Sequence, residues 1–376
     1  MKISFLSTFP PYRGGISKHS SLIYLYLSKK YDVQAVNFKK LYPNILFPGK
    51  SQYDYSQIDI GERSLNSINP FTWLKTVKII EKHNPDVLMF KFWHPFFVPA
   101  YKFIIKRIKK RCRSHIIMVC DNLFPHEKFP ISRKLIKGLV RNVDGFVVQS
   151  SIVEKELKSL VSKPVYIKRF HPVYDNYPEL IDKVKAKNML GVKESKVVLF
   201  FGFIRKYKGL DILIKSMEHI FKKDSDMKLL IAGECYDDKE RYQDLINKSK
   251  YKGQIEWVED FIPDSEISKY FSASDIVVLP YMSASQSGII PLAYHYNKPV
   301  ITSNIDSLVE VVQENKTGYI FERGDAIDLS LKISSFFNDC DSGFHNQEIE
   351  NYKVNFSWDF FISGIEDLCE GLNERA

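Results

Sequence analysis

The sequence lacks any apolar run long enough to cross a bilayer. No stretch of the 376 residues approaches the ~18 consecutive apolar side chains of a transmembrane helix. The opening segment, MKISFLSTFPPYRGG, also lacks the apolar core of ~7–15 residues and the small-residue cleavage site of a signal peptide. We therefore expect this segment to begin with a buried strand.

Cysteine is scarce and scattered. No Cys-x-x-Cys pair occurs, which predicts a reduced, cytoplasmic protein without structural zinc; the five cysteines are Cys112, Cys120, Cys235, Cys340 and Cys369. The Gly-x-Gly-x-x-Gly fingerprint of dinucleotide-binding enzymes is also missing, which argues against a nicotinamide-dependent oxidoreductase.

Negative charge is scarce in the first half of the chain. Residues 1–180 hold 30 Lys and Arg against 13 Asp and Glu, whereas the remainder holds 24 against 32. A basic half joined to an acidic half indicates two halves with different partners. Nucleic acid is not expected as one of them, because no recognised binding module accompanies the positive charge.

The positive charge is densest in two predicted helical stretches. Seven cations lie within residues 102–113, and Arg133, Lys134, Lys137 and Arg141 follow. A basic amphipathic helix favours an anionic membrane surface, although a solvated basic face is the common alternative. The apolar residues expected to enter the headgroup region are Phe96, Phe97, Tyr101, Phe103, Ile104 and Ile105.

Short β-branched runs alternate with helix-length stretches along the whole chain. This alternation is typical of parallel sheets with crossover helices, and the length fits two domains better than one. We predict an α/β protein with two doubly wound, Rossmann-like domains facing across a cleft. The predicted boundaries give an N-terminal acceptor domain at 1–178, a donor domain at 179–355, and a C-terminal helix at 356–376 that packs back on the first domain.

Three strand-to-helix turns carry groups suited to phosphate. Gly14 and Gly15 follow the first predicted strand, where small residues let a ligand approach the backbone and the helix start. Arg205 and Lys208 lie in the turn GFIRKYKG, where a guanidinium fork and an ammonium can bind phosphate oxygens. The amides of Ser287, Gly288 and Ile289 open a third helix. The alternatives are an ordinary turn, a solvated helix start and a capped buried helix.

The segment DNLFPHE follows another predicted strand of the first half. Asp121, His126 and Glu127 could contact a sugar or serve as acid and base groups. The structural alternative is that Asp121 caps the turn and that His126 is partly buried and hydrogen-bonded.

Together the glycine pair, GFIRKYKG, DNLFPHE and SGIIPLAYHYNKPVI resemble glycosyltransferase family 4, in the same order along nearly the whole chain. The resemblance implies the GT-B fold, a retaining mechanism and a nucleotide-diphosphate sugar donor. It implies that Arg205 and Lys208 hold the diphosphate, that Gly14 and Gly15 lie against the donor, and that the backbone of Phe261 and Ile262 contacts the base.

The sequence departs from that family in its donor loop. The family has two glutamates flanking the loop glycine, but this chain has Ser285 and Ala293, or Ala284 and Leu292, at the aligned positions. Gln286, Ser287 and Tyr294 are the polar side chains left to bind the donor.

These observations predict a hexosyltransferase of cell-surface polysaccharide synthesis that acts on a glycan or lipid-linked acceptor. Arg205, Lys208 and the loop amides would stabilise the leaving diphosphate, so no metal or other cofactor is expected. We expect a cytoplasmic protein, peripheral on the inner face of the plasma membrane. The alternatives are a nucleotide-sugar epimerase of the same fold and a non-catalytic nucleotide-sugar-binding subunit.

Overall fold

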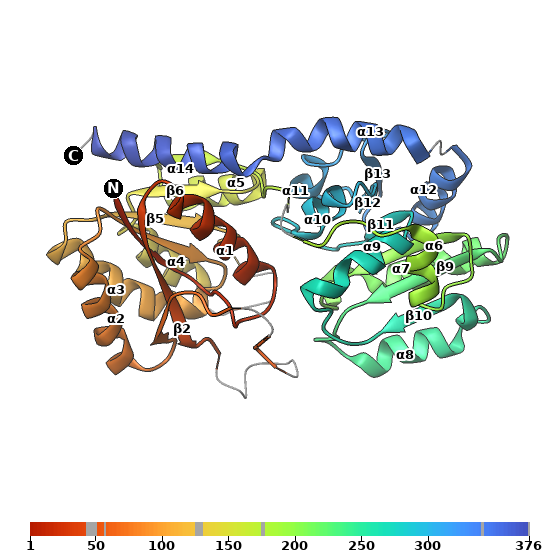
Figure 1. Ribbon diagram of the computed structural model, residues 1–376, viewed down its shortest axis with the longest axis horizontal. Helices are drawn as coiled ribbons and strands as arrows, with labels where there is room; N and C mark the ends of the chain where they lie inside the picture. Colours follow the sequence, from red (N-terminus) through yellow and green to blue (C-terminus); the bar gives the residue numbers. More distant parts are fainter. Residues whose placement is uncertain (43–50, 56–57, 125–130, 174–176, 340–341, 375–376) are drawn as a thin grey trace. The chain divides into compact units, whose positions relative to one another are not determined.

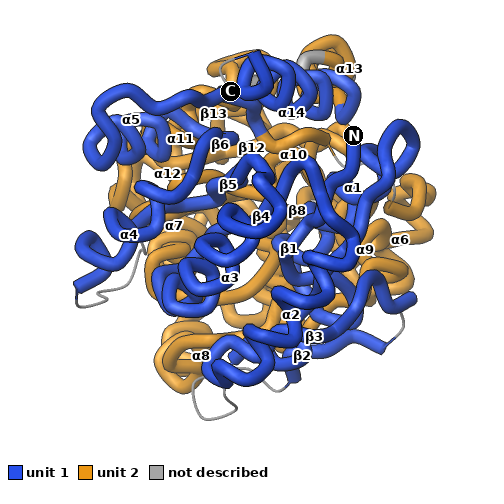
Figure 2. Tube along the Cα trace, turned by 90° about the vertical axis from the view of Figure 1, so that its left-hand side faces the viewer, with its two compact units in different colours: residues 1–170, 358–376 blue, residues 171–357 orange. Residues whose placement is uncertain are grey.

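The computed structural model describes residues 1–42, 51–55, 58–124, 131–173, 177–339 and 342–374. It divides into two compact units, coloured separately in Figure 2: Met1–Phe170 with Trp358–Ala376, and His171–Ser357. The predicted boundaries, after residues 178 and 355, lie close to these divisions. Helix α14 (Trp358–Asn373), at the end of the chain, belongs to the first unit.

The first unit contains a seven-stranded parallel sheet in the order β3-β2-β1-β4-β5-β6-β7. Its strands are β1 (Lys2–Leu6), β2 (Asp32–Lys40), β3 (Glu62–Asn66), β4 (Val87–Phe92), β5 (His115–Cys120), β6 (Gly145–Val148) and β7 (Tyr166–Lys168). The strand order reverses at β1 and β4, and in doubly wound sheets ligands bind near the carboxyl ends of the strands at such a point.

Helices connect these strands and cover the sheet (Figure 1). They are α1 (Gly15–Ser28), α2 (Pro70–His83), α3 (Val98–Arg111), α4 (Ser132–Val140) and α5 (Ser151–Leu160). Helices α1 and α14 lie side by side, and α2, α3 and α4 form a second group of neighbours. Trp358 of α14 packs on α1, with ring centroids 5.5 Å from those of His19 and Tyr26.

Alternation along β4 divides its side chains between two layers. Leu88, Phe90 and Phe92 belong to the core cluster that also contains the buried residues of α3. Successive side chains of a strand point to opposite faces. Lys91 therefore points to the other layer, towards α1, and it is fully buried there.

The second unit repeats this design with a six-stranded parallel sheet in the order β10-β9-β8-β11-β12-β13. Its strands are β8 (Lys196–Phe201), β9 (Met227–Ala232), β10 (Ile255–Val258), β11 (Ile276–Leu279), β12 (Val300–Ser303) and β13 (Gly318–Phe321). Its helices are α6 (Lys183–Met189), α7 (Leu210–Phe221), α8 (Lys239–Lys248), α9 (Ile267–Ala273), α10 (Ile289–His295), α11 (Asp306–Val309), α12 (Ala326–Asp339) and α13 (Ser342–Lys353).

The charge asymmetry of the sequence follows the two units. The first unit carries 31 Lys and Arg against 16 Asp and Glu, and the second carries 23 against 29. Within the described residues, no helix is both long and apolar enough to span a bilayer.

Candidate functional site

The turn after β8 is tied to the end of β11 by a glycine. Gly209 has a φ of 66°, and a Cβ atom there would lie 1.9 Å from the carbonyl oxygen of Pro280. The amide of Met282 also donates to the carbonyl of Tyr207, over 2.6 Å. These two contacts fix the one-turn helix η3 (Lys206–Lys208) against the segment that follows β11.

Lys208 is an ammonium group with no carboxylate beside it in the described part of the chain. Its Nζ lies 5.2 Å from the centre of the Tyr281 ring, and no acceptor among the described residues hydrogen-bonds to it. Burial lowers the pKa of Lys208; Tyr207 opposes this shift, and the positive charge of Arg205 adds to it. A half-buried cation without a counter-ion favours an incoming anion.

Arg205 lies beside a row of aromatic rings. Its guanidinium carbon is 5.4 Å from the centre of the Tyr236 ring. Phe203 stacks on Tyr236 at 4.6 Å and lies nearly parallel to Phe261 at 6.2 Å. The three rings follow β8, β9 and β10, so the carboxyl ends of three neighbouring strands present flat apolar surfaces next to a cation.

The loop before α10 reaches the same turn. A Cβ on Gly202, the residue after β8, would lie 3.4 Å from Cδ1 of Ile289 and 3.6 Å from Nζ of Lys208. The structure thus brings Lys208 and Ile289 together. Ser287 already accepts a hydrogen bond from the Ile289 amide at 3.2 Å, whereas Oε1 of Gln286 is buried and has no partner among the described residues.

The other residues predicted to bind the donor differ in how exposed and how engaged they are. Helix α10 has only seven residues and no side-chain cap at Gly288. The Phe261 amide donates to its neighbour Asp260 at 2.9 Å, and Ile262 is buried. Tyr294 is also buried, and its hydroxyl donates to the carbonyl of Val311, so it is committed to the core.

In the first unit, Gly14 and Gly15 begin α1. Gly14 has a φ of 104°, which favours glycine, and nothing lies within 4 Å of a Cβ built on Gly15. The start of this 14-residue helix is therefore open to a ligand at Gly15.

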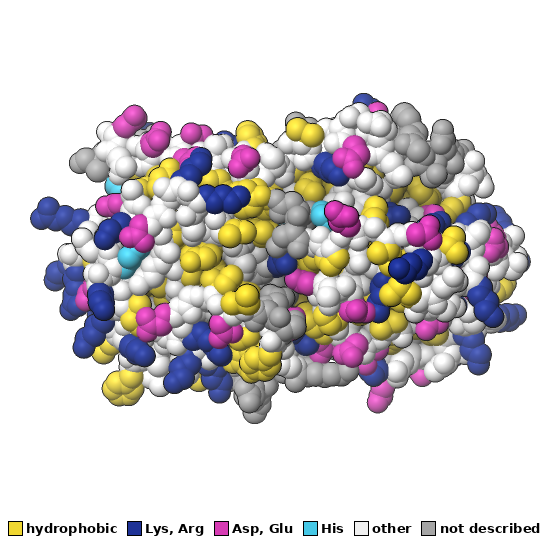
Figure 3. Space-filling view, viewed as in Figure 1, with side chains coloured by type: hydrophobic (Ala, Val, Ile, Leu, Met, Phe, Trp, Pro, Cys, Tyr) yellow, Lys and Arg dark blue, Asp and Glu magenta, His cyan; other side chains and the backbone are white. Residues whose placement is uncertain are grey.

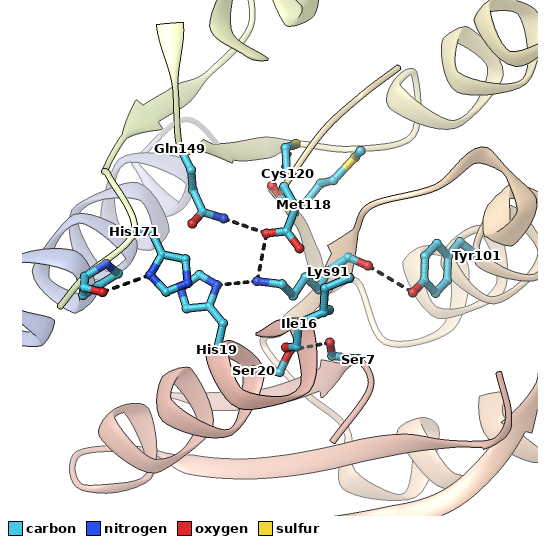
Figure 4. Close-up of polar contacts among 12 residues, drawn as sticks. Ser7, Ile16, His19, Ser20, Lys91, Tyr101, Met118, Cys120, Gln149 and His171 are labelled. Atoms are coloured by element: carbon cyan, nitrogen blue, oxygen red, sulfur yellow. Dashed lines mark hydrogen bonds and ion pairs between the residues drawn. The ribbon is translucent and has the colours of Figure 1, made fainter. Parts of the chain in front are cut away.

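Asp121 follows β5 and is buried. Figure 4 labels Lys91, Gln149 and His19 of the polar cluster around it. Its Oδ1 accepts hydrogen bonds from Nζ of Lys91 and Nε2 of Gln149, both at 2.9 Å. The Lys91 ammonium also contacts Nδ1 of His19. The structural alternative, in which Asp121 only caps the turn, does not include this ion pair. His126 and Glu127 lie outside the described residues.

The sequence interpretation missed Lys91, His19, Gln149 and Gly209. Three signals were available: a lysine inside an apolar strand, a polar residue directly after a strand, and a glycine before a helix.

The basic helices of the first unit present cations and few apolar side chains to solvent. The prediction that apolar residues of α3 and of the turn before it enter a membrane is wrong for Phe97, Tyr101, Ile104 and Ile105, which are at most 1% exposed. The apolar stripe of α3 packs on the sheet, so only its basic face is available.

The exposed apolar side chains of this region lie at α2 instead. Phe71 is 82% exposed, Ile68 54% and Leu74 45%. Helices α2 and α3 are neighbours, and Figure 3 shows Lys and Arg side chains gathered over this end of the first unit. Some cations are paired, since Lys109 contacts Asp144 and Arg111 contacts Glu81.

No group of three or more His, Cys, Asp or Glu side chains in the described ranges is arranged to hold a metal ion. Asp224 and Asp226 form an Asp-x-Asp pair, but they precede β9, at the amino end of the sheet. Asp224 pairs with Lys196 at 2.7 Å, and Asp226 accepts hydrogen bonds from Ser195.

The second unit resembles a known protein family. Residues 182–353 match the family model for glycosyl transferases group 1. The putative glycosyltransferase YtcC of Bacillus subtilis is 28% identical over 284 residues, covering 70% of this chain and 65% of the relative. CapM of Staphylococcus aureus, a capsular polysaccharide biosynthesis glycosyltransferase, is 27% identical over 160 residues, covering 42% of this chain and 41% of CapM. The chain therefore spans less than two thirds of the length of these relatives.

Solved structures establish the fold. The crystal structure of Anabaena HepE in complex with UDP-glucose superimposes with a TM-score of 0.76 and 17% identity, covering 100% of both chains. The prediction of a GT-B fold with two Rossmann-like units is confirmed.

Proposed function

We propose that the protein is a retaining glycosyltransferase that uses a nucleotide-diphosphate sugar. The observation that carries this proposal is the Lys208 ammonium, which lies at the carboxyl end of β8 without a carboxylate partner in the described residues. Arg205 and Lys208 supply the two positive charges that a diphosphate needs, and the aromatic row beside Arg205 suits a nucleobase.

The proposed reaction moves a hexose to a glycan or lipid-linked acceptor in cell-surface polysaccharide synthesis. The similarity to CapM and the UDP-glucose complex of HepE support this class of donor and product. Negative charge develops on the leaving diphosphate, and Arg205 and Lys208 would stabilise it without a metal ion or other cofactor. Gln286, with its unpartnered buried oxygen, is the donor-loop side chain available to a sugar hydroxyl.

The test is a thermal-shift screen of nucleoside diphosphates and nucleotide sugars, followed by assay of diphosphate release. A ligand at 100 times its Kd stabilises a protein by about 2.7 kcal/mol, which is readily measured. An epimerase would isomerise the donor without an acceptor, and a binding subunit would bind it without turnover. Absence of stabilisation by every nucleotide at millimolar concentration would contradict all three.

We also propose that the first unit docks peripherally on the cytoplasmic, anionic face of the plasma membrane. The excess of cations and the exposed Phe71, Ile68 and Leu74 beside them support this surface. Cations near such a membrane contribute about 1 kcal/mol each, and apolar side chains add burial in the headgroup region.

A further inference from the structure

Three neighbouring strands of the first unit place polar side chains in one layer. On each of these strands, alternate side chains belong to the core that also contains the buried residues of α3 and its neighbours. They are Phe90 and Phe92 of β4, Met118 and Cys120 of β5, and Phe146 and Val148 of β6. Alternation therefore directs the remaining positions, 91, 121 and 149, to the opposite layer. Lys91, Asp121 and Gln149 occupy these positions at the carboxyl ends of β4, β5 and β6, next to the strand-order reversal.

The Lys91 ammonium is enclosed by groups from several elements. It donates to Oδ1 of Asp121, which follows β5, and contacts Nδ1 of His19 from α1. An ammonium has only donor hydrogens, so Nδ1 of His19 accepts and the imidazole proton lies on Nε2. His19 is held in place by Trp358 and Phe361 of α14, at ring distances of 5.5 Å and 5.4 Å.

Only one of the two carboxylate oxygens of Asp121 is hydrogen-bonded to described residues. Oδ1 accepts two hydrogen bonds, whereas Oδ2 is buried without a partner among the described residues. Oε1 of Gln149 and Oδ1 of Asn122 are likewise buried without a partner in that part of the chain. All three orphaned atoms are acceptors, so a ligand that satisfies them must bring hydrogen-bond donors. A sugar offers such donors in its hydroxyl groups.

We propose that Lys91 is a positioning residue that fixes Asp121, through Oδ1, so that Oδ2 accepts a hydrogen bond from a substrate sugar hydroxyl. This inference rests on the proposed glycosyltransferase function and names a residue of that function beyond the donor phosphate site. It assigns Asp121 a binding role, because Oδ1 is already engaged by Lys91 and Gln149 and only Oδ2 is left to accept a hydrogen bond. The hydroxyl belongs to the donor sugar or to the acceptor sugar.

The test compares Lys91→Met, Asp121→Asn and the double variant. Each single variant leaves one buried charge unpaired and lowers the melting temperature by at least ~5 °C. The double variant is neutral and close in volume, so it recovers most of this loss. It nevertheless transfers sugar at least ~100-fold more slowly than the wild type, because no charged acceptor remains. Lys158→Met, which removes an exposed ion pair with Glu154, is the control and leaves both quantities unchanged.

Recovery of both stability and turnover in the double variant would overturn the proposal, since Lys91 and Asp121 would then only support the fold. A raised KM for nucleotide sugar assigns the hydroxyl to the donor, and a raised KM for acceptor assigns it to the acceptor. Nucleotide affinity, measured separately, stays unchanged because Arg205 and Lys208 lie in the other unit.

A second measurement does not depend on transfer. Methyl glycosides of glucose, galactose, mannose and N-acetylglucosamine are titrated while the His19 imidazole is followed by nitrogen NMR. The wild type should show a proton on Nε2 and a shift with at least one glycoside, and the double variant no shift. If the wild type binds nucleotide but transfers no sugar, the proposed function fails. The glycoside titration still tests whether Lys91 and Asp121 form a sugar-binding site. No shift across the panel would refute the sugar subsite.

Discussion

Replacing Lys208 with methionine should stabilise the free protein while it removes activity. The ammonium is half-buried against the Tyr281 ring, hydrogen-bonds to no described residue and has Arg205 as a like-charged neighbour. Methionine keeps the length of the stem and removes the charge. The folded protein then no longer bears the cost of burying an uncompensated cation.

The magnitude follows from that burial. Removing one unfavourable group of this kind typically stabilises a domain by about 0.5–2 kcal/mol. For a unit of this size each kcal/mol corresponds to about 2–4 °C in melting temperature, so we expect a rise of ~1–8 °C. Turnover should fall at least ~100-fold, as when one charge-stabilising donor is lost.

The binding of diphosphate should also depend on pH. The diphosphate binds the charged form of Lys208, whose pKa burial has lowered. Affinity should therefore decline at a lower pH than an ordinary lysine would allow, and binding should take up a proton near that pH. In Lys208→Met this pH dependence disappears.

The assays are thermal unfolding, calorimetric titration with nucleoside diphosphate and steady-state turnover. Lys206→Met is the matched control, because Lys206 belongs to the same turn but is exposed. It should change none of the three quantities appreciably. A lower melting temperature with normal nucleotide affinity in Lys208→Met would refute the reasoning, since Lys208 would then be a structural residue.

Three further predictions follow from individual positions. Gly209→Ala should lower nucleotide affinity more than tenfold and reduce the free energy of unfolding by about 1–3 kcal/mol, because the new Cβ meets the Pro280 carbonyl at a positive φ. Gly253→Ala is the control, because nothing lies within 4 Å of a Cβ at that position. Equal melting curves and affinities for the two variants would contradict this prediction. Phe71→Ser with Lys106→Gln should weaken sedimentation with anionic vesicles, and 1 M salt should do the same because the Debye length falls to ~3 Å; equal binding to neutral vesicles would exclude the membrane surface. Burial lowers the pKa of Lys298 to about 8, so unfolding above that pH takes up a proton. The stability of the wild type relative to Lys298→Met should therefore rise between pH 8 and 10. Stability curves that stay parallel over this range would contradict the prediction.

Much of the fold could be predicted, because the spacing of apolar residues and the amino-acid composition determine it. Alternating strands and helices imply a parallel sheet, and each unit contains one. Helix α6 (Lys183–Met189), which buries Ala186, could not be predicted in the same way. A helix this short and polar leaves only a weak periodic signal.

The candidate site was less predictable, since it depends on contacts between distant segments. Lys91 and Asp121 pair only because register places β4 beside β5, and His19 reaches them from the first helix. The importance of Gly209 arises from Pro280, 71 positions later in the sequence. The apolar residues of α3 were misassigned because their side of the helix is set by packing on the sheet.

The return of α14 to the first unit affects the order in which the protein can fold during synthesis. A ribosome releases residues 1–170 first, but Trp358 and Leu372 are still to come, and these pack on His19 and Gly145. Residues 171–357 are complete before them, so the second unit can finish folding while the nascent first sheet still lacks one of its covering helices. A chaperone that shields exposed apolar surface would be expected to hold this intermediate over α1 and β6, where α14 later docks.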